Sequence, residues 1–130
     1  MGATLFGDKL KDTVTPGSHG STFGGNPISA AGAISIVKRI DSDFLKEVEK
    51  KSEYIINFLK SVKGVKGISG MGLMLGIETD KDSKEIANEC LEKGLLVLTA
   101  KSKVRLLPAL NISYGELDEG LKILKEVIEK

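Results

Sequence analysis

The chain has 130 residues, of which 41% are hydrophobic and 28% are charged, and its formal net charge is +1. This length allows one modest core, and the near-neutral charge and 5% aromatic content give no case for binding nucleic acid or an anionic membrane. No apolar run is long enough to span a bilayer. The single cysteine excludes an internal disulfide and indicates a cytoplasmic protein, and no cluster of metal ligands is visible.

The first 25 residues are predicted to be extended or looped, and they lead into a glycine-rich segment. Residues 19–27 read HGSTFGGNP, with the hydroxyls of Ser21 and Thr22 close to three glycines. Backbone N–H groups and hydroxyls ahead of a helix can hold a phosphate or another anion. The alternative is an ordinary glycine-rich loop that caps a helix.

A helix is expected directly after this segment, from Pro27 to about Arg39. Asn26 is a favoured N-cap, and proline fits the first helical turn because its missing N–H would have no partner there. Small residues at positions 29–33 would let this helix approach another surface closely. The surface that it contacts could belong to another domain or another subunit.

Residues 41–130 are expected to fold as helix–strand–helix–strand–strand–helix, a compact α+β unit in which helices cover a small, mainly antiparallel sheet. A first helix follows the caps at 41–43, and its charged run at 47–51 is interpreted as a solvated face. Its apolar face is expected to carry Leu45, Val48, Ile55, Ile56, Leu59 and Val62. A strand around 73–77 follows, and its mixture of apolar residues suggests cover on both sides.

The remaining elements are marked by caps and short apolar runs. Asp82 with Glu85, and Ser113 with Glu116, fit the capping-box pattern for two further helices. Residues 95–99 and 104–107 are predicted to form two strands of a hairpin between them. The last helix is expected to bury Leu117, Leu121, Leu124 and Ile128.

Three further residues require a chemical interpretation. Arg105 interrupts an apolar strand, and arginine favours two-pronged contact with a carboxylate; the alternative is a stem that covers apolar surface while the head reaches water. His19 is best interpreted as a loop histidine, because no nucleophile with an orienting carboxylate is recognisable. Cys90 is best interpreted as a small buried hydrophobe. No residue is assigned a catalytic role.

Three segments resemble the class III aminotransferases, which depend on pyridoxal phosphate. Residues 19–27 match the family's segment closely, and residues 72–78 (GLMLGIE) resemble a strand of its small domain. Residues 94–100 (GLLVLTA) and 104–108 (VRLLP) resemble the acetylornithine branch more than the ornithine branch. The similarity extends over essentially the whole chain.

The resemblance implies a role for each candidate residue. Ser21 and Thr22 match the pair that contacts the cofactor phosphate across the dimer interface, and Arg105 matches the arginine that binds the substrate α-carboxylate. Residues 1–40 would then be a remnant of the large cofactor domain, and residues 41–130 the C-terminal small domain. The whole enzyme would move an amino group from N-acetylornithine to 2-oxoglutarate in arginine biosynthesis, as a homodimer.

The chain also departs from the family in ways that limit this interpretation. Ser69-Gly70 stands where an arginine–glycine pair is common. The resemblance covers only the last third of such an enzyme, so the Schiff-base lysine and the aspartate that pairs with the pyridine nitrogen are expected upstream, and the chain alone is expected to be inactive. The alternative is a stand-alone or engineered α+β domain that acts as a binding or folding module. The amino donor is not fixed by these residues.

Overall fold

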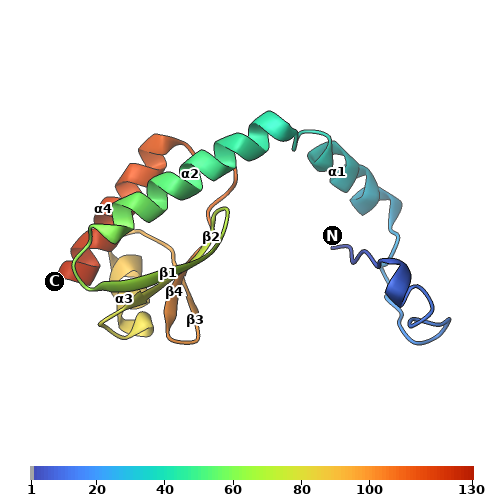
Figure 1. Ribbon diagram of the computed structural model, residues 1–130, viewed down its shortest axis with the longest axis horizontal. Helices are drawn as coiled ribbons and strands as arrows, with labels where there is room; N and C mark the ends of the chain where they lie inside the picture. Colours follow the sequence, from blue (N-terminus) through green and yellow to red (C-terminus); the bar gives the residue numbers. More distant parts are fainter. Residues whose placement is uncertain (1) are drawn as a thin grey trace. The chain divides into compact units, whose positions relative to one another are not determined.

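The computed structural model describes residues 2–130 and divides the chain into two units, Met1–Asp41 and Ser42–Lys130 (Figure 1). We call them unit 1 and unit 2 and describe each by itself. Unit 1 contains a short 3-10 helix, η1 (Asp8–Leu10), and the helix α1 (Pro27–Val37). Neither of these helices has a buried residue.

The start of α1 follows the prediction from the sequence. Pro27 occupies the first turn, and the Asn26 side chain accepts a hydrogen bond from the backbone N–H of Ser29 at 3.0 Å. The helix ends at Val37, two residues before the expected end. Its apolar side chains stay exposed, with Ile28 at 83% and Val37 at 67%.

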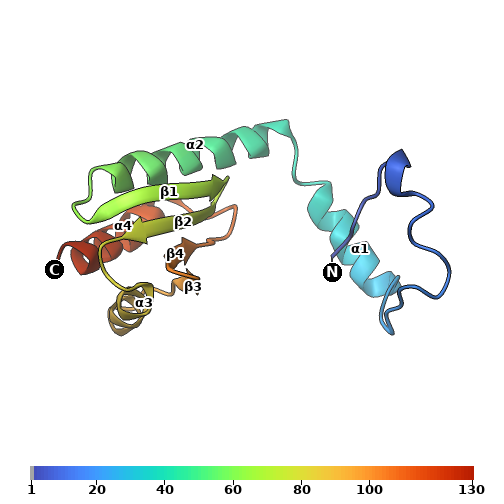
Figure 2. The same cartoon turned by 60° about the horizontal axis from the view of Figure 1, so that its bottom comes forward.

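Unit 2 is built on a four-stranded antiparallel sheet (Figure 2). Its strands are β1 (Val65–Met71), β2 (Met74–Thr79), β3 (Leu98–Ala100) and β4 (Lys103–Leu106), in the order β1-β2-β4-β3. The predicted hairpin between β3 and β4 is confirmed. Its first strand is shorter than expected, because residues 95–97 are not part of the sheet.

Three helices pack against this sheet: α2 (Ser42–Lys60), α3 (Ser83–Glu92) and α4 (Tyr114–Glu129). Helix α2 contacts β1 and α4, while α3 contacts α4, β3 and β4. On β2, Leu75 and Ile77 are buried, whereas Met74 and Glu78 are exposed. The expectation that this strand is covered on both sides is therefore wrong for unit 2: alternate residues enter one core, and the other face is open.

Strand β1 was not predicted from the sequence, which indicated a single strand between α2 and α3. Its sequence, VKGISGM, contains two glycines and a lysine and lacks the apolar run that marks β2. One glycine is required by the geometry. At Gly70, φ is +142°, and a Cβ atom would lie 2.0 Å from the carbonyl oxygen of Met74 on the paired strand. The close approach of the two backbones explains why glycine, which lowers strand propensity, occupies position 70.

The apolar face of α2 also differs from the expectation. Leu45 is 48% exposed, whereas Lys51, within the run interpreted as solvated, retains only 7% exposure. Val48, Lys51, Ser52, Ile55 and Leu59 form the buried stripe, at spacings of three and four residues. Lys51 lies on this stripe, so helical geometry buries it despite its charge.

The two capped helices begin where the sequence predicted. Asp82 accepts hydrogen bonds from the backbone N–H groups of Lys84 and Glu85. Ser113 and Glu116 form a complete capping box at the start of α4. The core side chains predicted for α4 are buried.

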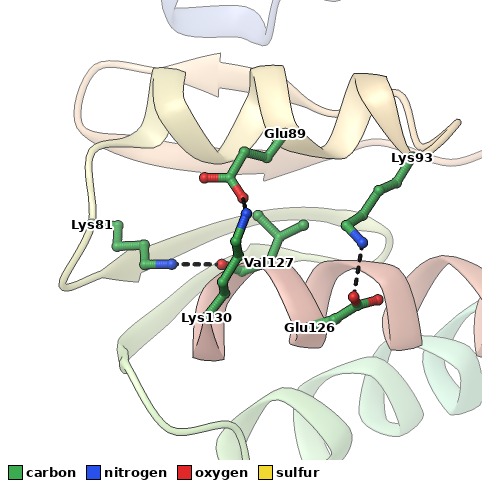
Figure 3. Close-up of polar contacts among 6 residues, drawn as sticks. All are labelled: Lys81, Glu89, Lys93, Glu126, Val127 and Lys130. Atoms are coloured by element: carbon green, nitrogen blue, oxygen red, sulfur yellow. Dashed lines mark hydrogen bonds and ion pairs between the residues drawn. The ribbon is translucent and has the colours of Figure 1, made fainter.

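Polar contacts join α4 to α3 and to the segment before α3 (Figure 3). In each of them a lysine ammonium reaches the partner. The contacts are Lys93 Nζ to Glu126 Oε1 at 2.8 Å, Lys130 Nζ to Glu89 Oε2 at 3.4 Å, and Lys81 Nζ to the Val127 carbonyl oxygen at 2.8 Å. Two of these contacts join α3 to the C-terminal end of α4, and the third joins the segment before α3 to α4.

Candidate functional site

Arg105 lies in the middle of β4, between two neighbouring strands. Its Cα pairs with Gly76 on β2 and with Leu98 on β3. Because side chains alternate along a strand, and the adjacent Val104 is fully buried beneath the helices, Arg105 belongs to the open face of the sheet. The sequence placed this arginine on a strand, and the structure confirms it.

A pocket of about 460 Å³ adjoins Arg105 in unit 2. Residues 95–98 form one wall, residues 105–108 form another, and Leu117, Leu121 and Leu124 of α4 lie beneath. Among its lining residues only Arg105 and Glu116 are charged, and no lysine lines it within residues 2–130. The sequence predicts a strand at residues 95–97, whereas in the structure these residues lie outside the sheet and form part of this wall. Gly94, with φ of +85° at the end of α3, was the local sign that the chain turns before reaching the sheet.

The guanidinium of Arg105 has a donor that the described chain does not satisfy. Its Nε atom is buried and has no hydrogen-bond partner, and no ion pair to Arg105 occurs among residues 2–130. Lys103 on the same strand, by contrast, has partners: its Nζ donates to Ser69 Oγ at 3.0 Å and lies 3.8 Å from Glu78 Oε2. A buried unpaired donor is costly and is common where a ligand supplies the acceptor.

Glu116 forms no ion pair with this arginine within residues 2–130, and its carboxylate is instead turned toward Ser113. Oε2 accepts hydrogen bonds from the Ser113 hydroxyl at 2.7 Å and from the Ser113 backbone N–H at 2.9 Å. These bonds lower the pKa of Glu116 below its usual value, the hydroxyl having the larger effect. An aliphatic pocket therefore adjoins an arginine whose Nε is unpaired, a combination that suits a carboxylate on a short carbon chain.

The glycine-rich segment of unit 1 presents its hydroxyls on a turn. Ser21 and Thr22 are exposed, and neither hydroxyl has a hydrogen-bond partner within the described residues. The Ser21 carbonyl accepts from the Gly24 N–H at 3.2 Å, and Gly25 has φ of +70°. Because Asn26 caps α1 with its own side chain, the hydroxyl pair is the more accessible set of anion donors here.

The other chemical candidates take the simpler interpretations. Cys90 is fully buried in α3, and burial raises the pKa of its thiol, so it behaves as a core residue. His19 is exposed in the loop of unit 1. None of the described helices is long and apolar enough to cross a membrane.

Comparisons with known proteins show the family to which this chain belongs. The family model for class-III aminotransferases matches residues 1–128, and the chain belongs to that family. One curated relative is the acetylornithine aminotransferase of Haemophilus ducreyi, which is 41% identical over 100% of this chain and 34% of the relative. Another is the acetylornithine aminotransferase of Clostridium acetobutylicum, which is 39% identical over 99% of this chain and 35% of the relative. The chain thus spans about a third of the length of these relatives.

Solved structures give the same result. The N-acetylornithine aminotransferase of Stenotrophomonas maltophilia aligns with a TM-score of 0.68 at 32% identity, covering 80% of this chain and 31% of that one. The ornithine δ-aminotransferase of Plasmodium falciparum aligns with a TM-score of 0.75 at 30% identity, covering 96% and 35%. The α+β fold expected from the sequence is confirmed.

Proposed function

We propose that this chain is the C-terminal part of a pyridoxal-phosphate-dependent aminotransferase of the acetylornithine type. The whole enzyme transfers an amino group from N-acetylornithine to 2-oxoglutarate, a step of arginine biosynthesis in the cytoplasm. The observation that carries the proposal is the buried, unpaired Nε of Arg105 beside an aliphatic pocket. Similarity to aminotransferases along the whole chain favours this function over a stand-alone binding or folding module.

In this proposal Arg105 binds the α-carboxylate of each substrate in turn. The amino donor and the 2-oxo acid both carry a carboxylate next to the reacting carbon, so one guanidinium can orient both. A bidentate contact fixes direction as well as position. The aliphatic lining excludes water around this contact and strengthens it.

Ser21 and Thr22 are proposed to hold the phosphate of the cofactor in the neighbouring subunit of a homodimer. Their free hydroxyls on an exposed turn fit an anion, because they can donate without breaking bonds within the chain. Pyridoxal phosphate, when bound, supplies the electron sink for moving the amino group. The lysine that carries it is expected in the part of the relatives that this chain does not span.

A chimera tests the proposal directly. We would replace the matching third of the Haemophilus ducreyi enzyme with this chain and measure transamination with N-acetylornithine and with ornithine. The expected result is a dimer that retains cofactor absorbance and transaminates. Ser21→Ala with Thr22→Val should weaken cofactor binding by about a hundredfold, roughly tenfold for each lost hydrogen bond to a charged group.

The controls separate misfolding from lost function. Ser18→Ala removes a hydroxyl of the same loop that is already bonded to the Thr15 carbonyl, so it should leave cofactor affinity unchanged. Circular dichroism and gel filtration report whether each chimera is folded and dimeric. A folded dimeric chimera that binds the cofactor but transaminates neither donor would contradict the proposed activity.

A further inference from the structure

A buried lysine on α2 has no place in the site described above. Lys51 is 7% exposed, whereas its neighbours Glu49 and Lys50 are exposed. Burying an ammonium is unfavourable unless the group finds partners. A methionine would fill similar space without that cost, so the packing of α2 alone does not need a charge at this position.

The partners of Lys51 lie in the connection between β4 and α4 and at the first residue of α4. Its Nζ donates to the carbonyl oxygen of Leu110 at 3.5 Å, across 59 positions of sequence. The same atom lies 5.8 Å from the centre of the Tyr114 ring, within the range of a cation–π contact. Both contacts therefore act on one short segment of the chain.

Other residues of α2 and α4 hold the Tyr114 ring in place. Interaction with the Tyr114 hydroxyl lowers the pKa of Glu47, one turn before Lys51, so the two side chains face each other. Tyr54, about one turn after it, meets the ring edge-on with centroids 5.5 Å apart, and its hydroxyl donates to Asp118. The i, i+4, i+7 spacing puts Glu47, Lys51 and Tyr54 on one face of α2.

The segment that Lys51 holds is also a wall of the pocket. Leu107, Pro108 and Ile112 line the pocket beside Arg105, while Lys51 and Tyr114 do not. Within the segment, the Ile112 N–H is bonded to the Ala109 carbonyl at 3.0 Å. Any shift of the Leu110 carbonyl therefore moves the residues that follow Arg105 directly along the chain.

We propose that Lys51 is a positioning residue for the carboxylate pocket: it holds the Leu110 carbonyl and so fixes the 107–112 wall next to Arg105. The ammonium does not reach the pocket and acts only through the backbone. This inference deepens the proposed function and depends on it for the meaning of the pocket. The contacts of Lys51 stand independently of that function.

The test uses the 130-residue chain labelled with ¹⁵N arginine, because its sequence contains only Arg39 and Arg105. Lys51→Met should shift the Nε–H signal of Arg105 and leave that of Arg39 in place. In hydrogen exchange followed by mass spectrometry, the amides of residues 110–112 should exchange roughly tenfold faster, as expected for losing a hydrogen bond to a charged group. Glutarate, used as the carboxylate probe, should bind roughly tenfold more weakly, and Lys51→Arg should restore all three properties.

Lys46→Met is the matched control, since Lys46 lies on the same helix and pairs only with exposed Asp43. It should change none of these measurements. If Lys51→Met does not fold, Tyr114→Leu removes the ring under the ammonium and should act in the same direction. An unchanged Arg105 signal with unchanged exchange at 110–112, or faster exchange spread evenly over unit 2, would overturn the proposal. If glutarate leaves Arg105 unmoved in the unsubstituted chain, the proposed function fails, while the exchange result still decides the role of Lys51.

Discussion

Replacing Arg105 by methionine should stabilise unit 2, although arginine interacts with water more favourably than methionine does. The substitution removes the buried Nε that has no acceptor and keeps an unbranched stem of similar length. It places an apolar side chain beside a pocket whose walls are mostly leucine. A binding residue that lacks its ligand commonly costs stability in this way.

The size of the effect follows from the single unsatisfied donor. Leaving a buried donor unpaired costs about 1–3 kcal/mol. Because the side chain of Arg105 as a whole is only half-buried, the lower end of this range applies, and we expect a gain of about 1 kcal/mol. For a domain of this size such a gain raises the melting temperature by roughly 4–8 °C.

Urea unfolding and calorimetry of the 130-residue chain measure this gain. Lys103→Met is the matched comparison, because Lys103 lies on the same strand but has partners in Ser69 and Glu78. It should lower stability by a few tenths of a kcal/mol, of the order measured for half-exposed pairs. If Arg105→Met instead lowers the free energy of unfolding by 1 kcal/mol or more, the guanidinium is a structural group, and our reasoning about an unpaired donor is refuted.

Three further results are expected. Gly70→Ala should lower the free energy of unfolding in urea by roughly 3 kcal/mol or more, because φ is +142° and the new Cβ meets the Met74 carbonyl. Gly32→Ala, in open space on α1, should not lower it. Equal losses for the two variants would show that the close approach at Gly70 does not determine the cost. The free energy of unfolding should fall as the pH drops below about 4.5, because hydrogen bonds from Ser113 and Lys93 lower the pKa of Glu116 and of Glu126, respectively, in the folded state. Lys93→Met should make this dependence on pH shallower. A urea midpoint that does not change with pH would contradict the effect of these bonds. Amide exchange should be slowest in α2, β2 and α4 and fast throughout residues 2–41, whose helices bury no side chain; strong protection of α1 would show otherwise.

Much of unit 2 could be predicted from local signals in the sequence. Ser113 with Glu116 marked the start of α4, and the spacing of Leu117, Leu121 and Leu124 marked its buried face. Such features depend on residues within two turns of one another, which makes them readable without tertiary contacts. Arg105 could be singled out for a similar reason, since a charge within a short apolar strand needs an explanation.

Other features depend on contacts that sequence spacing does not report. Strand β1 forms because β2 pairs with it, despite two glycines that weaken its own propensity. Lys51 is buried because the β4–α4 connection offers it a carbonyl and the first residue of α4 offers it a ring, both from 59 or more positions away. The unpaired state of Arg105 likewise became visible only when its neighbours were placed, because the same pattern fits an arginine whose head reaches water.

The most direct test of the central claim is the effect of Arg105→Met on substrate binding by the chimera with the Haemophilus ducreyi enzyme. We expect KM to rise for both N-acetylornithine and 2-oxoglutarate, by roughly 10–100-fold for the loss of a charge-assisted contact, while cofactor absorbance stays unchanged. A KM within twofold of the unsubstituted chimera for both substrates would show that Arg105 does not bind their carboxylates.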